Sequence, residues 1–142
     1  MAEPAYDPNN VFGKILRGEM PAHKVYEDAH TLAFMDVMPQ GDGHTLVIPK
    51  APSRGLLDAE PETLAAVMRS AQIVGRAVKA AFEADGLTVF QFNEAAGGQT
   101  VFHLHVHLIP RHEGVPLKRH EGGMADPELL AGHAARIRAA LG

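Results

Sequence analysis

The spacing of apolar residues along the chain predicts three helices. A short helix begins after Asn10, a residue type that caps helix N-termini, and ends before Gly18. Its apolar face carries Val11, Phe12, Ile15 and Leu16. The segment 61–84 has the strongest helical pattern, since apolar residues recur at steps of three and four. This stripe consists of Leu64, Met68, Ala71, Val74, Val78 and Phe82. A third helix is expected over 127–141, with Asp126 as its N-cap.

Runs of β-branched, aromatic and alternating apolar residues predict strands between these helices. They cover 24–27, 31–36, 45–49, 87–93 and 101–110. The order is helix, three strands, long helix, two strands, helix, and the links within each strand group are short. We therefore expect an α+β fold: one antiparallel sheet of about five strands, a long helix packed on it, and short N- and C-terminal helices. A chain of 142 residues is the size of one domain, 1–142.

Composition narrows the class of protein. Apolar residues make up 46% and charged residues 21%, which is enough for a sizeable core. The net charge of -4 argues against a protein that coats a nucleic acid polymer. There is no cysteine, which excludes disulfides and thiolate metal sites. No apolar run is long enough to span a bilayer, and the N-terminus lacks the plan of a signal peptide, so we expect a cytoplasmic protein without a membrane partner.

Three of the nine histidines lie within five positions. Residues 102–108 read Phe, His, Leu, His, Val, His, Leu. Side chains of a strand alternate between two faces, so the apolar members are expected toward the core and His103, His105 and His107 in a row on the opposite face. An ordinary exposed face would carry Thr, Lys, Glu or Ser there, so the row points to chemistry. Apart from His44, the remaining histidines are expected at the surface: His23, His30, His112, His120 and His133.

The row of three histidines can be interpreted as a metal site or as a nucleophile with its neighbours. Two histidines two apart on a strand can chelate zinc, but the outer α-carbons of three would lie about 13 Å apart. A two-histidine site would need help from elsewhere, such as His44. Alternatively, neutral imidazole attacks phosphorus and forms a covalent intermediate that water opens. His105, with an imidazole on each side, is then the natural nucleophile, and the preceding loop, Gly97 to Thr100, offers free backbone N–H groups for a phosphate.

Longer stretches of the chain resemble the histidine triad (HIT) family. They are VFGKILRGEMPAHKVYED, LAFMDVMPQGDGHTLVIPK and FNEAAGGQTVFHLHVHLIPR, in the family's usual order. The resemblance covers about 9–113, leaving 114–142 as a tail with a helix, and the spacing is most similar to the bacterial-type Hint branch, the nucleoside phosphoramidases. It implies the HIT fold and homodimers that join two sheets side by side.

The resemblance also implies roles for individual residues. His105 matches the nucleophile, His107 the histidine at the α-phosphate, His103 the first triad histidine and His44 a supporting histidine. Asp36 matches the acid that holds the ribose hydroxyls. Residues around the phosphate are matched by Asn93, Gly98, Gln99 and Thr100, and the apolar walls around the base by Phe12, Ile15, Phe34 and Val37. Many bacterial relatives bind zinc through a Cys-x-x-Cys where this chain has Asn10 to Gly13, so we expect no metal and no cofactor.

The resulting hypothesis is a hydrolase that acts at the α-phosphate of nucleoside phosphoramidates or related nucleotidyl compounds through a nucleotidyl-histidine at His105. The expected ligand is a purine nucleotide such as AMP or GMP. One alternative is a dinucleoside polyphosphate hydrolase of the Fhit branch, although Asp36 favours Hint. Others are a nucleotide-binding regulatory module with incidental activity and a metal-binding protein.

Overall fold

The computed structural model describes residues 4–119 and 123–142. In chain order its elements are α1 (Val11–Leu16), β1 (Lys24–Glu27), β2 (Thr31–Met35), β3 (Thr45–Pro49), α2 (Pro61–Ala81), β4 (Gly86–Phe90), a 3-10 turn η1 (Ala95–Gly97), β5 (Val106–Arg111) and α3 (Pro127–Leu141). Asn10 and Asp126 cap α1 and α3 through their side chains, as their residue types predict. Within the described ranges, no helix has the length and apolar character needed to cross a membrane.

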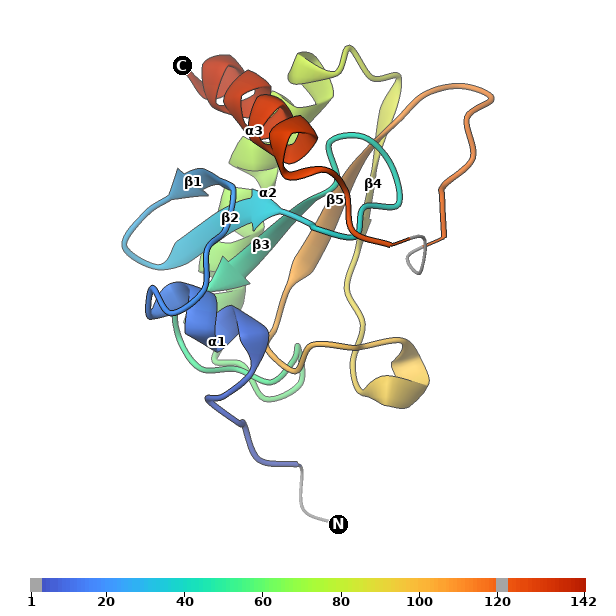
Figure 1. Ribbon diagram of the computed structural model, residues 1–142. Coiled ribbons are helices and arrows are strands. Elements are labelled where there is room, and N and C mark those ends of the chain that lie inside the picture. The colour runs from blue at the N-terminus through green and yellow to red at the C-terminus, as the bar shows by residue number, and fades with distance from the viewer. Residues whose placement is uncertain (1–3, 120–122) are drawn as a thin grey trace.

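The five strands form one antiparallel sheet in the order β1-β2-β3-β5-β4 (Figure 1). The last strand in sequence therefore lies between β3 and β4. The predicted α+β class with a five-stranded antiparallel sheet and a long helix is confirmed.

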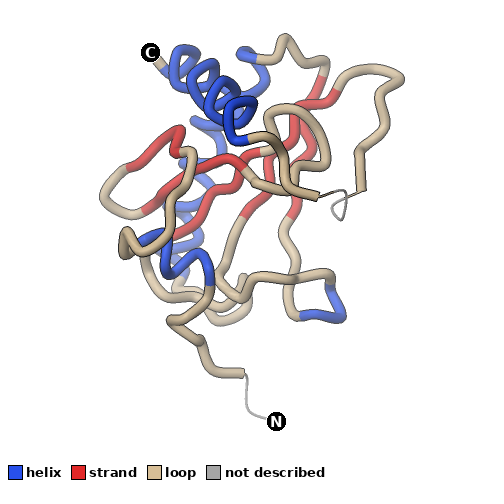
Figure 2. The backbone as a smooth tube through the Cα atoms, viewed as in Figure 1, coloured by secondary structure: helices blue, strands red, loops and turns tan. Residues whose placement is uncertain are grey.

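Helices cover both faces of the sheet (Figure 2). On one face α2 packs against β2, β3, β4 and β5, and α3 packs against α2, β1 and β2. Their core includes Val47, Val74 and Leu108, none of which is exposed. On the other face α1 encloses a smaller apolar cluster formed by Phe12, Ile15, Leu32, Phe34, Leu46 and Ile48. This smaller layer lies on the side of the sheet that carries the histidines.

The helix α2 differs in detail from its prediction. Met68 is 54% exposed, whereas Val67 is buried, so the core-facing stripe is shifted by one residue at this turn. The helix ends at Ala81 rather than at 84, because Glu83 adopts a positive φ of 47° that breaks the helical backbone.

The strand predicted over 101–110 begins only at Val106, which corrects the alternation argument. Continued antiparallel pairing with β3 would place Leu104 opposite Pro49, which has no N–H to donate. The Pro49 carbonyl instead accepts from the ring of His103, and the Leu104 N–H donates to Ser53 O. Residues 101–105 are thus a separate segment, held by bonds outside the sheet.

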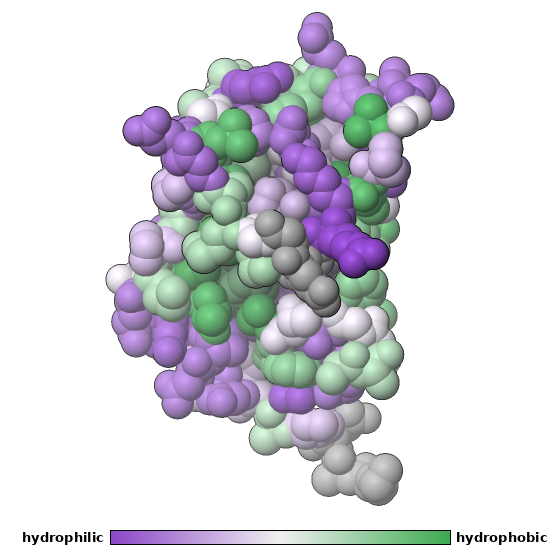
Figure 3. Space-filling view, turned by 45° about the vertical axis from the view of Figure 1, so that its right-hand side comes forward, coloured by the Kyte–Doolittle hydropathy of each residue, from purple (hydrophilic) through white to green (hydrophobic). Residues whose placement is uncertain are grey.

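On the face drawn in Figure 3, hydrophobic residues form small patches separated by hydrophilic ones. The most exposed large apolar side chains, Leu57 and Met124, lie in loops far apart in the sequence. Single apolar residues at the surface are ordinary in soluble domains.

Candidate functional site

The three histidines of the row are buried, not aligned on an open face. Their exposed fractions are 0% for His103, 6% for His105 and 5% for His107. Only His107 lies in a strand, paired with Leu46 of β3. The other two belong to the segment 101–105, and the ring of Phe12 from α1 lies edge-on to His105 at 4.9 Å. The short N-terminal helix therefore covers the nucleophile predicted from the sequence.

The hydrogen bonds of His105 leave one ring nitrogen suited to attack. Its Nδ1 lies 2.7 Å from the carbonyl oxygen of His103. Because a carbonyl oxygen only accepts, Nδ1 must carry the proton. In the neutral ring Nε2 then holds the lone pair, which is the requirement for a nucleophilic imidazole.

His103 is fixed through both ring nitrogens. Its Nε2–H donates to the Pro49 oxygen at 2.8 Å, so its Nδ1 is an acceptor and the Tyr6 hydroxyl donates to it at 2.6 Å. Burial lowers the pKa of His103 from 6.5 to about 4, with a contribution from the neighbouring His105. His103 is thus a neutral structural group at neutral pH. The sequence analysis missed Tyr6, whose segment carried no periodic pattern.

His44 and His107 form a second directed pair. The Gln40 backbone N–H donates to His44 Nδ1 at 3.0 Å, which puts the His44 proton on Nε2. That nitrogen lies 2.9 Å from His107 Nδ1 and donates to it. Neutral His107 therefore carries its proton on Nε2, as a donor. His44, which directly precedes β3, thus contacts His107 through its ring.

Asp36 directly follows β2 and is also buried, with 6% exposed. Its Oδ1 accepts from the Met38 N–H at 2.8 Å, and its Oδ2 lies 3.4 Å from His44 Nε2. Ligand atoms of Asp36, His44 and His107 lie within 4.8 Å of one another, which is a donor set that zinc accepts. The hydrogen bonds already described engage both ring nitrogens of His44 and Nδ1 of His107. Residues 10–13 supply only Asn10 as a polar side chain, and its amide caps α1.

The loop before the triad is built by side chains that hold backbone. Gln99 is 3% exposed; its Oε1 accepts from Glu94 N at 2.7 Å, and its Nε2 donates to Arg54 O and Val101 O. Asn93 Oδ1 accepts from the Leu56 N–H at 2.8 Å. These two amides therefore shape the loop.

Two other predicted loop residues stay at the surface. Gly98 and Thr100 are both exposed. Gly98 has φ 103°, a conformation that glycine adopts without strain. The backbone N–H groups of Gly97 and Gln99 donate to the Glu94 oxygen, and that of Gly98 donates to the Ala95 oxygen. This corrects the expectation that the loop offers these N–H groups to a phosphate.

The predicted apolar walls divide into two kinds. Phe12, Ile15 and Phe34 are buried together beside the histidines, and the rings of Phe12 and Phe34 meet edge to face at 5.3 Å. Val37 is 41% exposed, beyond the end of β2. The first three can line one side of a base, and Val37 can cover it from solvent.

The other histidines correct one expectation. His133 is buried on α3, with its ring edge-on to Phe82 at 5.0 Å, and burial lowers its pKa. His23 and His112 are half-buried and His30 is exposed. His120 lies outside the described residues.

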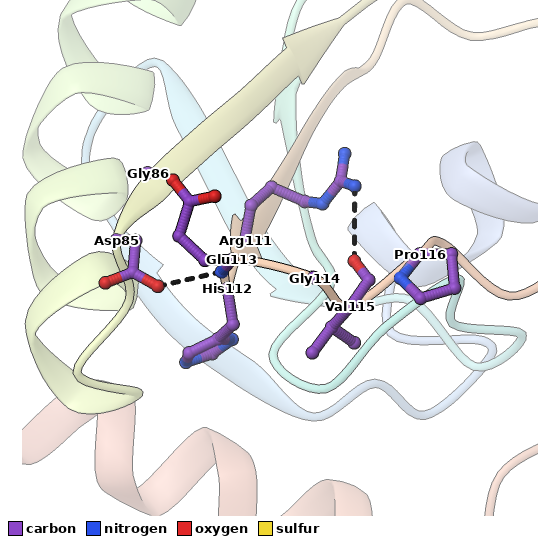
Figure 4. Close-up of a pocket in the computed structure, with 8 residues that line it drawn as sticks. All are labelled: Asp85, Gly86, Arg111, His112, Glu113, Gly114, Val115 and Pro116. Carbon is purple, nitrogen blue, oxygen red and sulfur yellow. Dashed lines mark hydrogen bonds between the residues drawn. The ribbon is translucent and has the colours of Figure 1, made fainter.

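A pocket of about 640 Å³ lies at the opposite end of β5 from His107 (Figure 4). Two of its charged side chains are paired within it or at its edge: Asp85 accepts from the Glu113 N–H, and Arg111 donates to Thr88 and to the Val115 carbonyl. None of the catalytic or substrate-binding residues predicted from the sequence lines this pocket. The histidine cluster is the stronger candidate for chemistry.

Comparison with known proteins identifies a family model and solved structures that are similar to this chain. The family model described as "HIT domain" matches residues 17–114. A crystal structure of a Hit-like protein from Bartonella henselae, described as involved in cell-cycle regulation, is 56% identical, covers 96% of this chain and 99% of that one, and superposes with a TM-score of 0.90. The structure of a hypothetical histidine triad nucleotide-binding protein from Sulfolobus tokodaii is 34% identical, with a TM-score of 0.82 over 90% of this chain and 89% of that one.

A curated relative from Arabidopsis thaliana, "Adenylylsulfatase HINT3", is 40% identical over 103 residues, which are 72% of this chain and 52% of that protein. This chain therefore spans about half of that relative's length.

Proposed function

Because this chain belongs to the HIT family, we propose that it is a nucleotide hydrolase that cleaves nucleoside phosphoramidates or related nucleotidyl compounds at the α-phosphorus. The observation that carries the proposal is the hydrogen bond from His105 Nδ1–H to the His103 carbonyl, which puts the lone pair of the neutral ring on Nε2. A buried histidine held in this tautomer is poised for covalent catalysis.

In the first step His105 Nε2 attacks the α-phosphorus, the nitrogen–phosphorus bond to the histidine forms, and the bond to the leaving amine breaks. The ring then carries positive charge. The His103 carbonyl accepts from Nδ1–H and stabilises this charge within a buried site, where a fixed dipole acts strongly. Charge on the phosphoryl oxygens is met by the donor Nε2–H of His107 and by the backbone N–H of Thr100, since the N–H groups of Gly98 and Gln99 already donate within the loop.

In the second step water attacks the phosphorus, the bond to His105 breaks and the nucleoside monophosphate leaves. Over both steps one water is consumed, and a proton from it ends on the released amine. Asp36 is proposed to hold the ribose hydroxyls, since a carboxylate accepts from both. The buried rings of Phe12 and Phe34 would line the base, with a purine such as that of AMP or GMP giving the larger contact.

The alternative activities differ in the group that leaves the α-phosphorus. The name of the Arabidopsis relative supports a trial of adenylyl sulfate beside an amine-bearing substrate. Diadenosine polyphosphates test a Fhit-like activity. The name of the Sulfolobus relative supports nucleotide binding in its own right, so a binding module with incidental turnover is a further outcome.

The family resemblance also supports a homodimer in which two sheets join side by side, acting as one domain over 1–142 in the cytoplasm. The edge strands β1 and β4 each have one side free of strands in the described fold, and such a junction can form at either edge.

The test is mass spectrometry of the intact protein soon after it is mixed with adenosine 5'-phosphoramidate, together with an assay of released AMP. We expect AMP release and a transient adduct of one AMP in the wild type and in His30→Ala, a control at an exposed histidine between β1 and β2. His105→Ala should lose both while still binding AMP. Full turnover in His105→Ala would refute the covalent mechanism, and binding without turnover in the wild type would favour the binding module.

A further inference from the structure

The N-terminal segment 4–9, which we name the strap, is tied to the body of the protein although it forms neither helix nor strand. Arg54 Nη1 donates to the Ala5 oxygen at 3.4 Å, and Arg17 Nη1 donates to the Pro8 oxygen at 2.8 Å. The Asn10 amide donates to the Asp7 oxygen at 2.7 Å. The strap precedes residues 17–114, the part of the chain that the family model matches. The strap therefore reaches the site from outside the matched residues.

One guanidinium connects the strap with the loop before the triad. Besides Ala5, Arg54 binds the Glu94 carboxylate through Nε at 2.7 Å and Nη2 at 2.9 Å. Its carbon lies 4.3 Å above the Phe102 ring, in the geometry of a cation–π contact. Glu94 has φ 64°, a conformation that a non-glycine residue keeps only when its surroundings hold it. The strap thus shares its anchor with the loop proposed to bind phosphate.

The strap delivers a phenol to a fully buried ring. Tyr6 is half-buried, and its hydroxyl donates to His103 Nδ1 at 2.6 Å while the two rings lie edge to face at 5.5 Å. Since His103 is 0% exposed and its other nitrogen donates to Pro49, bulk water cannot readily replace the phenol. Loss of this donor would leave a buried acceptor unpaired.

His103 in turn sets the position of the nucleophile. Residues 101–105 lie outside the sheet, so the strand ladder does not fix them. The His103 carbonyl holds the ring of His105, and the His103 ring is clamped between Tyr6 and Pro49. Rotation of the His103 ring would break its bond to Pro49 and loosen the segment that carries His105, which the bonds from Leu104 N–H to Ser53 O and from Gln99 Nε2 to Val101 O also hold.

We propose that Tyr6 is a positioning residue for the nucleophile, acting through His103 and reaching the site from the strap. The proposal rests on the nucleotidyl-transfer function given above. It gives the strap, which lies outside residues 17–114, a role in positioning the nucleophile. Tyr6 exchanges no proton with the substrate; its hydroxyl fixes one ring so that a second ring faces the phosphorus.

The experiment compares Tyr6→Phe with Tyr26→Phe, which is a matched control because these are the only two tyrosines in the chain. Tyr26 also donates a phenol hydrogen bond, to Asp28, but it lies in β1 against the opposite core. With adenosine 5'-phosphoramidate we expect kcat to fall about tenfold in Tyr6→Phe, with KM within about twofold of wild type. In Tyr26→Phe both constants should stay at their wild-type values.

Nitrogen-15 NMR of the histidine rings gives a readout that does not depend on activity. The Nδ1 signal of His103 should move in Tyr6→Phe, because that nitrogen loses its donor, and should not move in Tyr26→Phe. Wild-type kcat in Tyr6→Phe, a loss confined to KM, or an unchanged His103 signal would each overturn the proposal. If the wild type itself does not hydrolyse nucleotides, the proposed function fails, and the NMR comparison still decides whether Tyr6 fixes His103.

Discussion

Acidification from pH 7 to pH 4 tests whether the fold holds His103 neutral. The pKa of this ring is lowered from 6.5 to about 4, chiefly by burial. Between these values the unfolded chain binds a proton that the native protein does not, so the free energy of unfolding falls as the pH falls. The difference of pKa corresponds to about 3 kcal/mol, all of it present above pH 6.5 and lost on approach to pH 4. That is a large share of the stability of an ordinary domain.

The assay is urea unfolding of the wild type and of His103→Gln at several pH values, with linear extrapolation. Glutamine keeps an N–H for the Pro49 carbonyl but does not titrate. Other groups, such as the buried His133, titrate in both proteins and cancel in the difference between them. We expect the stability advantage of the wild type over His103→Gln to shrink by about 3 kcal/mol between pH 7 and pH 4. A difference that stays constant with pH would refute the argument that burial keeps this ring neutral.

Three further predictions follow from the packing and the site. Val67→Ala should lower the free energy of unfolding by about 2 kcal/mol, and Met68→Ala by less than about 0.5 kcal/mol, measured by urea unfolding; the reverse order would contradict the observed helix face. Gly43→Ala should cost about 3 kcal/mol, because φ is +83° and a Cβ would lie 2.8–2.9 Å from side-chain carbons, whereas Gly132→Ala, in open space on α3, should stabilise slightly. Asp36→Asn should weaken binding of AMP about tenfold in calorimetry and binding of 2'-deoxy-AMP much less; an equal loss for both would assign Asp36 to His44 alone.

Local patterns predicted most elements because those elements obey local rules. The caps Asn10 and Asp126 and the strand bounds of β1 and β3 follow from residue type and alternation. The predicted start of β5 was wrong because the partner strand, β3, determines where pairing ends. Pro49 of β3, more than fifty residues earlier, has no N–H with which to extend the ladder. A pattern within 101–110 holds no information about that partner.

In the site, too, local sequence predicts some features and distant contacts determine the others. The spacing of the histidines and the adjoining glycines pointed to a nucleophile, but not to which ring nitrogen holds the lone pair. That choice comes from acceptors and donors elsewhere in the chain, such as the Gln40 N–H and Pro49 O. Tyr6 had no local signal, since its contact with His103 spans 97 residues. His133 did have one: it shares a helix face with Leu130, Ala134 and Ile137, all buried.

The order of the strands has a consequence for how the protein is made. β4 leaves the ribosome before β5, yet β5 lies between β3 and β4 in the finished sheet. Until β5 emerges, β4 has no neighbour with which to pair. The strand that closes the sheet also carries His107 and directly follows His105. A nascent chain that stops short of residue 106 therefore has neither a continuous sheet nor a complete triad, and catalytic competence begins only when the sheet is whole.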